Sequence, residues 1–178
     1  MLIVLIASHF VFIQEASSQA MVAFFEKFDE QGSRIELEPG GRFFHVAIWN
    51  GTAWVHAHPS YGVIESSEKV ASIGELAVIL RHDSYSSDHL NKLKRWLNRP
   101  YDHQFDWSRS DCFYCSELVA KALGVEPHLE MGFRASHWQE SLVNLPRGEL
   151  GLSPDDLIEP LIEQGFYEIP RCQWTHLF

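Results

Sequence analysis

The chain has 178 residues, a length that fits one folded domain with a substantial hydrophobic core. Hydrophobic residues make up 46% and charged residues 21% of the chain, which excludes a disordered protein. A formal net charge of −10 and the lack of a Lys/Arg-rich run argue against a polyanion binder, so nucleic acid is not an expected partner. Three cysteines are too few for a disulfide scaffold and leave the cellular compartment open.

The first residues favour buried β-structure. Leu2–Ala7 and Phe10–Gln14 are rich in Ile, Val and Phe and predict two strands. The apolar run Met1–Ile13 is, at about 13 residues, too short to cross a bilayer as a helix, so we expect no stable membrane span. No Lys or Arg precedes this run, unlike in a signal peptide, so we expect Met1–Ala20 to remain in the mature protein.

The elements that follow alternate between helix and strand patterns. A helix is predicted from Ser17 or Ser18 to about Glu30, with Gly32 as its stop. Its wide apolar face consists of Met21, Val22, Phe24, Phe25 and Phe28. The later predicted elements are strands at Val63–Glu65, Glu75–Leu80 and Phe166–Ile169 and helices after Ser86 or Ser87, from about Cys115 to Gly124, and after Ser153. This succession predicts an α+β fold in which an antiparallel sheet packs against helices, in one domain of residues 1–178.

A hairpin is predicted around Asn50-Gly51, because this pair between two β-favouring runs is typical of a two-residue type I′ turn. In that register His45 lies directly opposite His56, with Cβ atoms roughly 5 Å apart. One face of the hairpin is entirely apolar and consists of Phe44, Val46, Ile48, Ala53, Val55 and Ala57. The other face gathers histidines and aromatic residues, namely Phe43, His45, Ala47, Trp49, Thr52, Trp54, His56 and His58.

Cys115 is the candidate nucleophile. It stands at the start of a short predicted helix, where the helix dipole favours the reactive thiolate. A thiolate nucleophile needs a partner that accepts and returns its proton, and His45 can serve as this base while His56 orients its ring. His58 is the alternative to His56, because it lies on the same face. We therefore expect the histidine-bearing face to turn towards the Cys115 helix.

Short motifs of the chain resemble those of papain-like NlpC-type amidases and peptidases: Phe44-His45-Val46-Ala47-Ile48, Trp54-Val55-His56-Ala57 and Tyr114-Cys115-Ser116-Glu117-Leu118-Val119. The histidine motif precedes the cysteine motif, an order similar to that of the circularly permuted, YiiX/YebB-like branch. Pro100-Tyr101-Asp102 and Leu152-Ser153-Pro154-Asp155-Asp156-Leu157 extend the resemblance, which spans roughly Phe10 to Leu157. The chain departs from the branch at His56, where glutamate is frequent, and at Ser8-His9, where many relatives have Gly-Asp.

The resemblance implies a papain-like fold with Cys115 as nucleophile, His45 as base and His56 as third residue. It further implies attack on an amide or ester carbonyl and an acyl-thioester intermediate, followed by hydrolysis or acyl transfer, with no cofactor and no metal. The oxyanion is expected at backbone N–H groups where the Cys115 helix begins. Relatives act on peptide amides and permuted relatives include lipid-acting enzymes, so the expected partner is a small-molecule, peptide or lipid-amide substrate. The residues expected to contact it are Tyr101, Tyr114 and Trp54.

Other functions stay open at the level of sequence. Cys112 and Cys115 form a Cys-x-x-Cys at a helix start, which is typical of thiol–disulfide oxidoreductases. Cys112, Cys115, Cys172 and His176 have the ligand types of a zinc site. A catalytically inactive binding module on the same fold is a further alternative.

Overall fold

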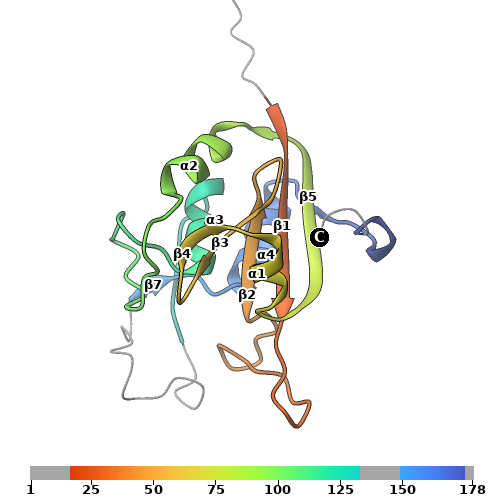
Figure 1. The fold of residues 1–178 in the computed structure, drawn as a ribbon, viewed down its shortest axis with the longest axis vertical. Helices are drawn as coiled ribbons and strands as arrows, with labels where there is room; N and C mark the ends of the chain where they lie inside the picture. The colour runs from red at the N-terminus through yellow and green to blue at the C-terminus, as the bar shows by residue number, and fades with distance from the viewer. Residues whose placement is uncertain (1–16, 133–148, 175–178) are drawn as a thin grey trace, which may run out of the picture.

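Figure 1 shows the computed structural model of the chain, which describes residues 17–132 and 149–174. The strands are β1 (Ser17–Glu26), β2 (His45–Trp49), β3 (Trp54–His58), β4 (Gly62–Glu65), β5 (Glu75–Ser86), β6 (Leu129–Glu130), β7 (Leu150–Gly151) and β8 (Tyr167–Glu168). Six of them form one sheet in the order β4-β3-β2-β1-β5-β8, with antiparallel neighbours throughout, and β6 and β7 form a separate ribbon. The helices are α1 (Ser67–Ala71), α2 (Asp88–Trp96), α3 (Cys115–Leu123) and α4 (Ile158–Glu163), with 3-10 turns η1 (Asp155–Leu157) and η2 (Arg171–Gln173).

The predicted α+β class and antiparallel sheet are confirmed. The predicted strands at 63–65, 75–80 and 166–169 correspond to β4, β5 and β8, and the helices after Ser87 and Tyr114 are α2 and α3. The helix expected after Ser153 is divided into η1 and α4. Helix α1 and the β6–β7 ribbon were not predicted, and the strands predicted at 2–7 and 10–14 lie outside the described residues.

The helix predicted from Ser17 or Ser18 to Glu30 is wrong, because these residues form the long strand β1. β1 pairs with β2 along one edge and with β5 along the other, so neither edge of the strand is free. Its side chains alternate between two core clusters: Ala20, Val22 and Phe24 belong to one, and Met21, Ala23 and Phe25 belong to the other. A strand buried on both faces reads as a continuous apolar run, which residue spacing alone cannot distinguish from a helix with a wide apolar face.

The predicted two-residue turn is also wrong. Ile48 pairs with Val55 and Trp49 with Trp54, so the four residues 50–53 connect the strands. The Asn50 side chain organises this loop by accepting hydrogen bonds from the backbone N–H groups of Thr52 and Ala53, at 3.0 and 2.9 Å. The register therefore differs by two residues from the predicted one, and an even shift leaves every side chain on its predicted face.

Helix α3 packs on the apolar face of the β2–β3 hairpin. The expectation that it faces the histidine-bearing side is therefore wrong. Its buried aliphatic side chains share a core cluster with Val46, Ile48 and Val55. Ala47 and Trp54 of the opposite face belong to the second cluster, on the other side of the sheet. In Figure 1, α2 and α3 lie side by side to the left of β1 and β5, and their residues contact each other.

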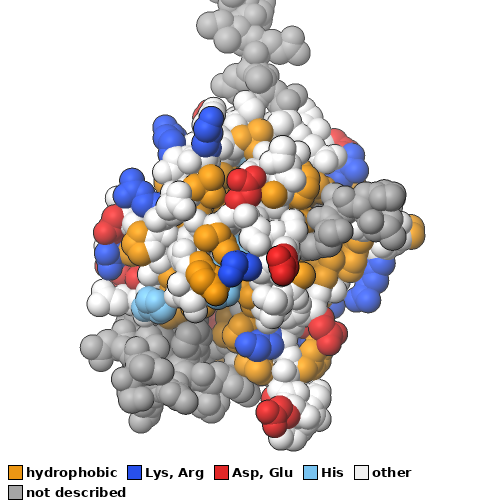
Figure 2. Space-filling model, viewed as in Figure 1, with side chains coloured by type: hydrophobic (Ala, Val, Ile, Leu, Met, Phe, Trp, Pro, Cys, Tyr) orange, Lys and Arg blue, Asp and Glu red, His pale blue; other side chains and the backbone are white. Residues whose placement is uncertain are grey.

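Charged side chains are dispersed over the face drawn in Figure 2, where Lys and Arg alternate with Asp and Glu among apolar residues. No helix in the described part of the chain is long and apolar enough to cross a membrane.

Replacing Phe24 with Ala tests the two-sided burial of β1. Phe24 is 0% exposed and contacts the Phe43 ring at 5.1 Å between centroids. Because the truncation leaves a cavity in the core, we expect the free energy of unfolding to fall by about 3–5 kcal/mol in urea denaturation. Phe28→Ala is the matched control, because Phe28 is 36% exposed and follows β1. Equal losses for the two variants would contradict the burial of β1.

Candidate active site

Cys115 is the first residue of α3, and its neighbours fix the start of this helix. The Tyr114 backbone N–H donates a hydrogen bond to the Glu117 carboxylate at 3.1 Å, which closes the first turn. Glu117 is fully buried and pairs with Lys121, with 2.6 Å between Oε1 and Nζ. Burial raises the pKa of Glu117 to about 7 in spite of this pairing. Gly124 ends the helix, as predicted.

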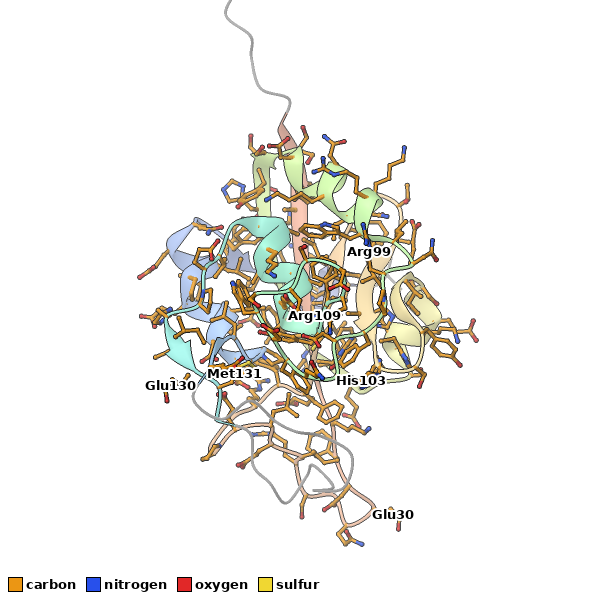
Figure 3. All side chains as sticks on the ribbon, turned by 90° about the vertical axis from the view of Figure 1, so that its left-hand side faces the viewer. Glu30, Arg99, His103, Arg109, Glu130 and Met131 are labelled. Carbon is orange, nitrogen blue, oxygen red and sulfur yellow. The ribbon has the colours of Figure 1, made fainter. Side chains whose placement is uncertain are left out.

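Lys121 connects α3 to the loop that precedes it. Its Nζ donates to the backbone carbonyls of Trp107 and Arg109, both at 2.7 Å, and lies over the Trp107 ring. Figure 3 labels Arg109 in front of α3. One partly buried ammonium group therefore holds the loop and the helix of Cys115 together.

The same loop brings two aromatic rings to the site. The Asp102 carboxylate accepts hydrogen bonds from the backbone N–H groups of Gln104 and Asp106, at 2.9 and 2.7 Å. Between them, Phe105 has a left-handed backbone conformation, with φ of 55°. This conformation is costly for a bulky residue and is characteristic of functional sites. The Phe105 ring packs against Tyr114 and Tyr101, with centroids 5.2 and 6.2 Å apart.

Gly62 places the beginning of this loop. A Cβ at this position would lie 2.1 Å from the Arg99 carbonyl oxygen, so only glycine permits the approach. Two backbone hydrogen bonds, both of 2.8 Å, join Val63 of β4 to the segment 98–99. The Val63 N–H donates to the Arg99 carbonyl, and the Asn98 N–H donates to the Val63 carbonyl. Tyr101 therefore follows a segment that is fastened to the edge strand β4.

Cys115 and His45 line one cavity of about 150 Å³. The predicted substrate residues Tyr101 and Tyr114 line it as well. Its apolar wall includes Leu37, Phe44, Ile73, Phe105, Met131 and Pro154. The cavity lies where β2 begins, and Figure 3 shows two further lining residues, His103 and Met131, on either side of the lower end of α3.

His45 and His56 form a direct hydrogen bond, with 2.9 Å between His45 Nε2 and His56 Nδ1. The contact is diagonal rather than directly cross-strand, because the hairpin register is shifted by two residues. If His45 Nδ1 is free to accept a proton, its own proton is on Nε2 and is donated to His56. His56 then carries its proton on Nε2, a buried atom with no hydrogen-bond partner among the described residues. Such an atom costs about 1–3 kcal/mol of stability.

Among the described residues, His58, the alternative third residue, makes no hydrogen bond with His45 or His56. Its Nδ1 accepts a hydrogen bond from the Ser60 backbone N–H at 3.0 Å, and its ring stacks against Tyr61 with centroids 4.7 Å apart. His58 contacts His56 ring to ring, at 5.8 Å between centroids. The geometry therefore favours His56 over His58 as the partner of His45.

At Cys115, burial opposes the thiolate that the start of the helix favours. Burial raises the pKa of Cys115 to about 11, although the backbone N–H groups of Val46 and Ser116 partly offset it. Burial and the neighbouring histidines, His56 first, hold the pKa of His45 well below its usual range. Burial likewise lowers the pKa of His56 to about 4. At neutral pH the cysteine is therefore a thiol and the two histidines are uncharged.

The other predicted site residues lie away from the cavity. Trp54 is fully buried on the opposite side of the sheet from α3, and it does not line the cavity. Cys112 is also buried and outside the cavity, with its thiol 3.7 Å from Asp111 Oδ1, and burial raises its pKa to about 12. Of the predicted zinc ligands, Cys172 is exposed and His176 lies outside the described residues.

Several cavity residues carried no signal in the sequence. Leu37 and Met131 lie in segments outside the histidine and cysteine motifs, and they line the same cavity only in the folded chain. Ser116 and Ser153 also line the cavity, and the motifs around Cys115 and Pro154 contain them. The two motifs could therefore have suggested the serines, but not the apolar residues.

The chain matches no protein-family model and no curated protein. Its structure is similar to the crystal structure of metalloprotein YiiX, DUF1105, from Escherichia coli O157:H7, with a TM-score of 0.54 and 22% sequence identity. The similarity covers 88% of this chain and 97% of that chain, so the fold is YiiX-like. Among the residues described here, no group of three or more His, Cys, Asp or Glu side chains could hold a metal ion.

Lys121→Met tests the buried ion pair. We expect a loss of about 3 kcal/mol in the free energy of unfolding at pH 8, because Glu117 stays buried without its cation. The loss should shrink towards pH 5, since the pKa of Glu117 is already raised and its protonated form needs no cation. Glu117→Gln in the same chain should restore much of the stability. Lys92→Met is the control, because Lys92 binds backbone carbonyls and no carboxylate among the described residues. An equal, pH-independent loss there would contradict the interpretation.

Proposed function

We propose that the chain is a papain-like cysteine hydrolase of the permuted NlpC type that cleaves an amide or ester through an acyl-thioester. Cys115 is the nucleophile, His45 the base and His56 the residue that orients His45. The observation that carries the proposal is the cavity shared by Cys115 and His45, together with the His45–His56 hydrogen bond of 2.9 Å. The YiiX-like fold supports the papain-like assignment, because the histidine strand precedes the cysteine helix.

The reaction starts from uncharged groups. As Cys115 Sγ attacks the carbonyl carbon, its proton passes to Nδ1 of His45, and the resulting imidazolium is stabilised by donating its Nε2 proton to His56. The bond to the leaving nitrogen or oxygen then breaks, and that atom takes the proton from His45. Water next adds to the thioester and gives a proton to His45, the C–S bond breaks, and the sulfur recovers the proton.

Backbone N–H groups at the start of α3 are the proposed oxyanion donors. The amides of Val46 and Ser116 already favour negative charge on the adjacent sulfur, as their effect on the pKa of Cys115 indicates. Donors fixed by a helix start and a strand start need no rearrangement when charge develops on the carbonyl oxygen. Tyr101, whose hydroxyl pKa is raised well above its usual range by burial and by Cys115, is proposed to contact the substrate beside the sulfur.

An acyl-enzyme measurement tests the nucleophile. After mixing with p-nitrophenyl butanoate, intact-mass analysis should find one butanoyl group on Cys115, and Cys115→Ala should lose the adduct and at least about 1,000-fold in hydrolysis rate. Cys112→Ser is the matched control and should stay within about twofold of the wild type, because Cys112 does not line the cavity. A Cys112→Ser variant as inactive as Cys115→Ala would instead favour a dithiol oxidoreductase.

The pH dependence of kcat/KM tests the base. His45 accepts a proton only when it is uncharged, and its pKa is held below the ordinary 6.5. Activity should therefore persist as pH falls through 6.5 and decline only at lower pH. His56→Gln should lower kcat by about 10- to 100-fold and move this acid limb, because Gln cannot reproduce the same bond to His45. An acid limb at or above pH 6.5 in the wild type would refute the assignment of His45.

A further inference from the structure

The described lining of the cavity around Cys115 contains no Lys, Arg, Asp or Glu side chain. His103 and Pro59 are the exposed members of the lining, and the His103 ring packs at a tilt against Tyr101 with centroids 4.9 Å apart. A substrate group that is itself charged would lose its hydration inside without gaining a counter-ion, which is strongly unfavourable.

The hydroxyl groups of the lining serines are already used elsewhere. Ser116 Oγ donates to the Leu152 carbonyl at 2.6 Å, and Ser153 Oγ donates to the Asp156 carboxylate at 2.9 Å. The Tyr114 hydroxyl receives the Leu152 backbone N–H at 3.4 Å. Besides the groups next to the sulfur, where the carbonyl would react, the polar groups that the described lining leaves for a substrate are the hydroxyl proton of Tyr114 and the exposed ring of His103. Apart from the two serines, the remaining lining side chains are apolar.

The cavity is also small. Its volume of about 150 Å³ is below the range of about 300–1,000 Å³ that is usual for pockets of drug-sized ligands. A cavity of about 150 Å³ with an apolar lining is known to hold one benzene molecule. A single ring or a short hydrocarbon chain fits this space, whereas a long unbranched chain does not.

Met131 closes one wall of the cavity and is held there by its neighbours. It is 6% exposed and packs in a cluster with Phe105 and Tyr114. A Cβ at Gly151, on the facing strand of the β6–β7 ribbon, would lie 2.0 Å from the Met131 sulfur. Because Gly151 has no side chain, the Met131 thioether can pack against its backbone. The position of Met131 then limits the size of the cavity on that side.

We infer that the cavity is an acyl pocket for a short, uncharged, apolar acyl group, no larger than one aromatic ring or a chain of about four to six carbons. The inference rests on the proposed hydrolase function and adds the class of acyl group to it. It excludes acyl groups that bear a free carboxylate or amine, and it excludes long fatty acyl chains.

A series of p-nitrophenyl esters tests the inference at a constant leaving group. We expect kcat/KM to be highest for the butanoate and benzoate and at least about tenfold lower for the decanoate and the negatively charged hemisuccinate. Met131→Ala should move the preference towards the decanoate, and Met131→Leu, of nearly equal volume, should preserve it. Leu129→Ala is the matched control, because Leu129 belongs to the same ribbon, is 46% exposed and does not line the cavity. Equal rates for butanoate and decanoate, or for butanoate and hemisuccinate, would overturn the inference and leave the hydrolase function standing.

Binding to Cys115→Ala separates the two proposals, because it needs no turnover. Ligand-observed NMR should detect benzamide and butanamide in the pocket, displaced by each other, and should not detect succinamate. This pattern without any esterase or amidase activity of the wild type would refute the hydrolase and keep the pocket. Succinamate binding as strong as that of butanamide would refute the pocket whatever the activity.

Discussion

The burial of β1 on both faces determines where the other elements can lie. Because β1 has hydrogen-bonded neighbours on both edges and apolar cores on both faces, the sheet separates two packed layers. Helix α3 belongs to one layer, and the His45–His56 pair lies on the face of the other. A cysteine on α3 and a histidine of β2 can share a cavity only where the sheet ends, and there the cavity is found. The site is thus a consequence of the sheet's boundary and not of a cleft between domains.

The same burial sets the electrostatics of the site. A thiol whose pKa is raised to about 11 and histidines whose pKa is lowered form an uncharged set, in contrast to a thiolate–imidazolium pair. In the proposed reaction, proton transfer must therefore accompany attack on the carbonyl. Before a substrate binds, this uncharged set avoids the free-energy cost of a buried ion pair. Stabilisation of charge is then needed only in the transition state of the proposed reaction.

The sequence was informative where local signals and burial agreed. Cys115 at a helix start, Gly124 at its end and the strand β5 follow from capping and composition, and all are found. The hairpin register was wrong by two residues, yet the histidines still meet, because an even shift keeps the faces. β1 was mistaken for a helix because an apolar run buried on two faces has lost its alternation. The lining by Leu37 and Met131 could not be predicted, since it depends on distant segments that meet only after folding.

The cavity has one wall that Lys121 fastens to helix α3 and another wall that is independent of Lys121. The two walls therefore differ in how readily substitutions can alter them. Through Glu117, Trp107 and Arg109, Lys121 joins the helix of Cys115 to the aromatic loop. On the opposite wall, Met131 directly follows β6 of the two-stranded ribbon, which is separate from the main sheet. Substitutions in that ribbon can reshape the cavity while the reacting groups keep their positions. Under the proposed function, evolution or protein engineering could therefore change the substrate preference through the ribbon, with Cys115 and His45 unchanged.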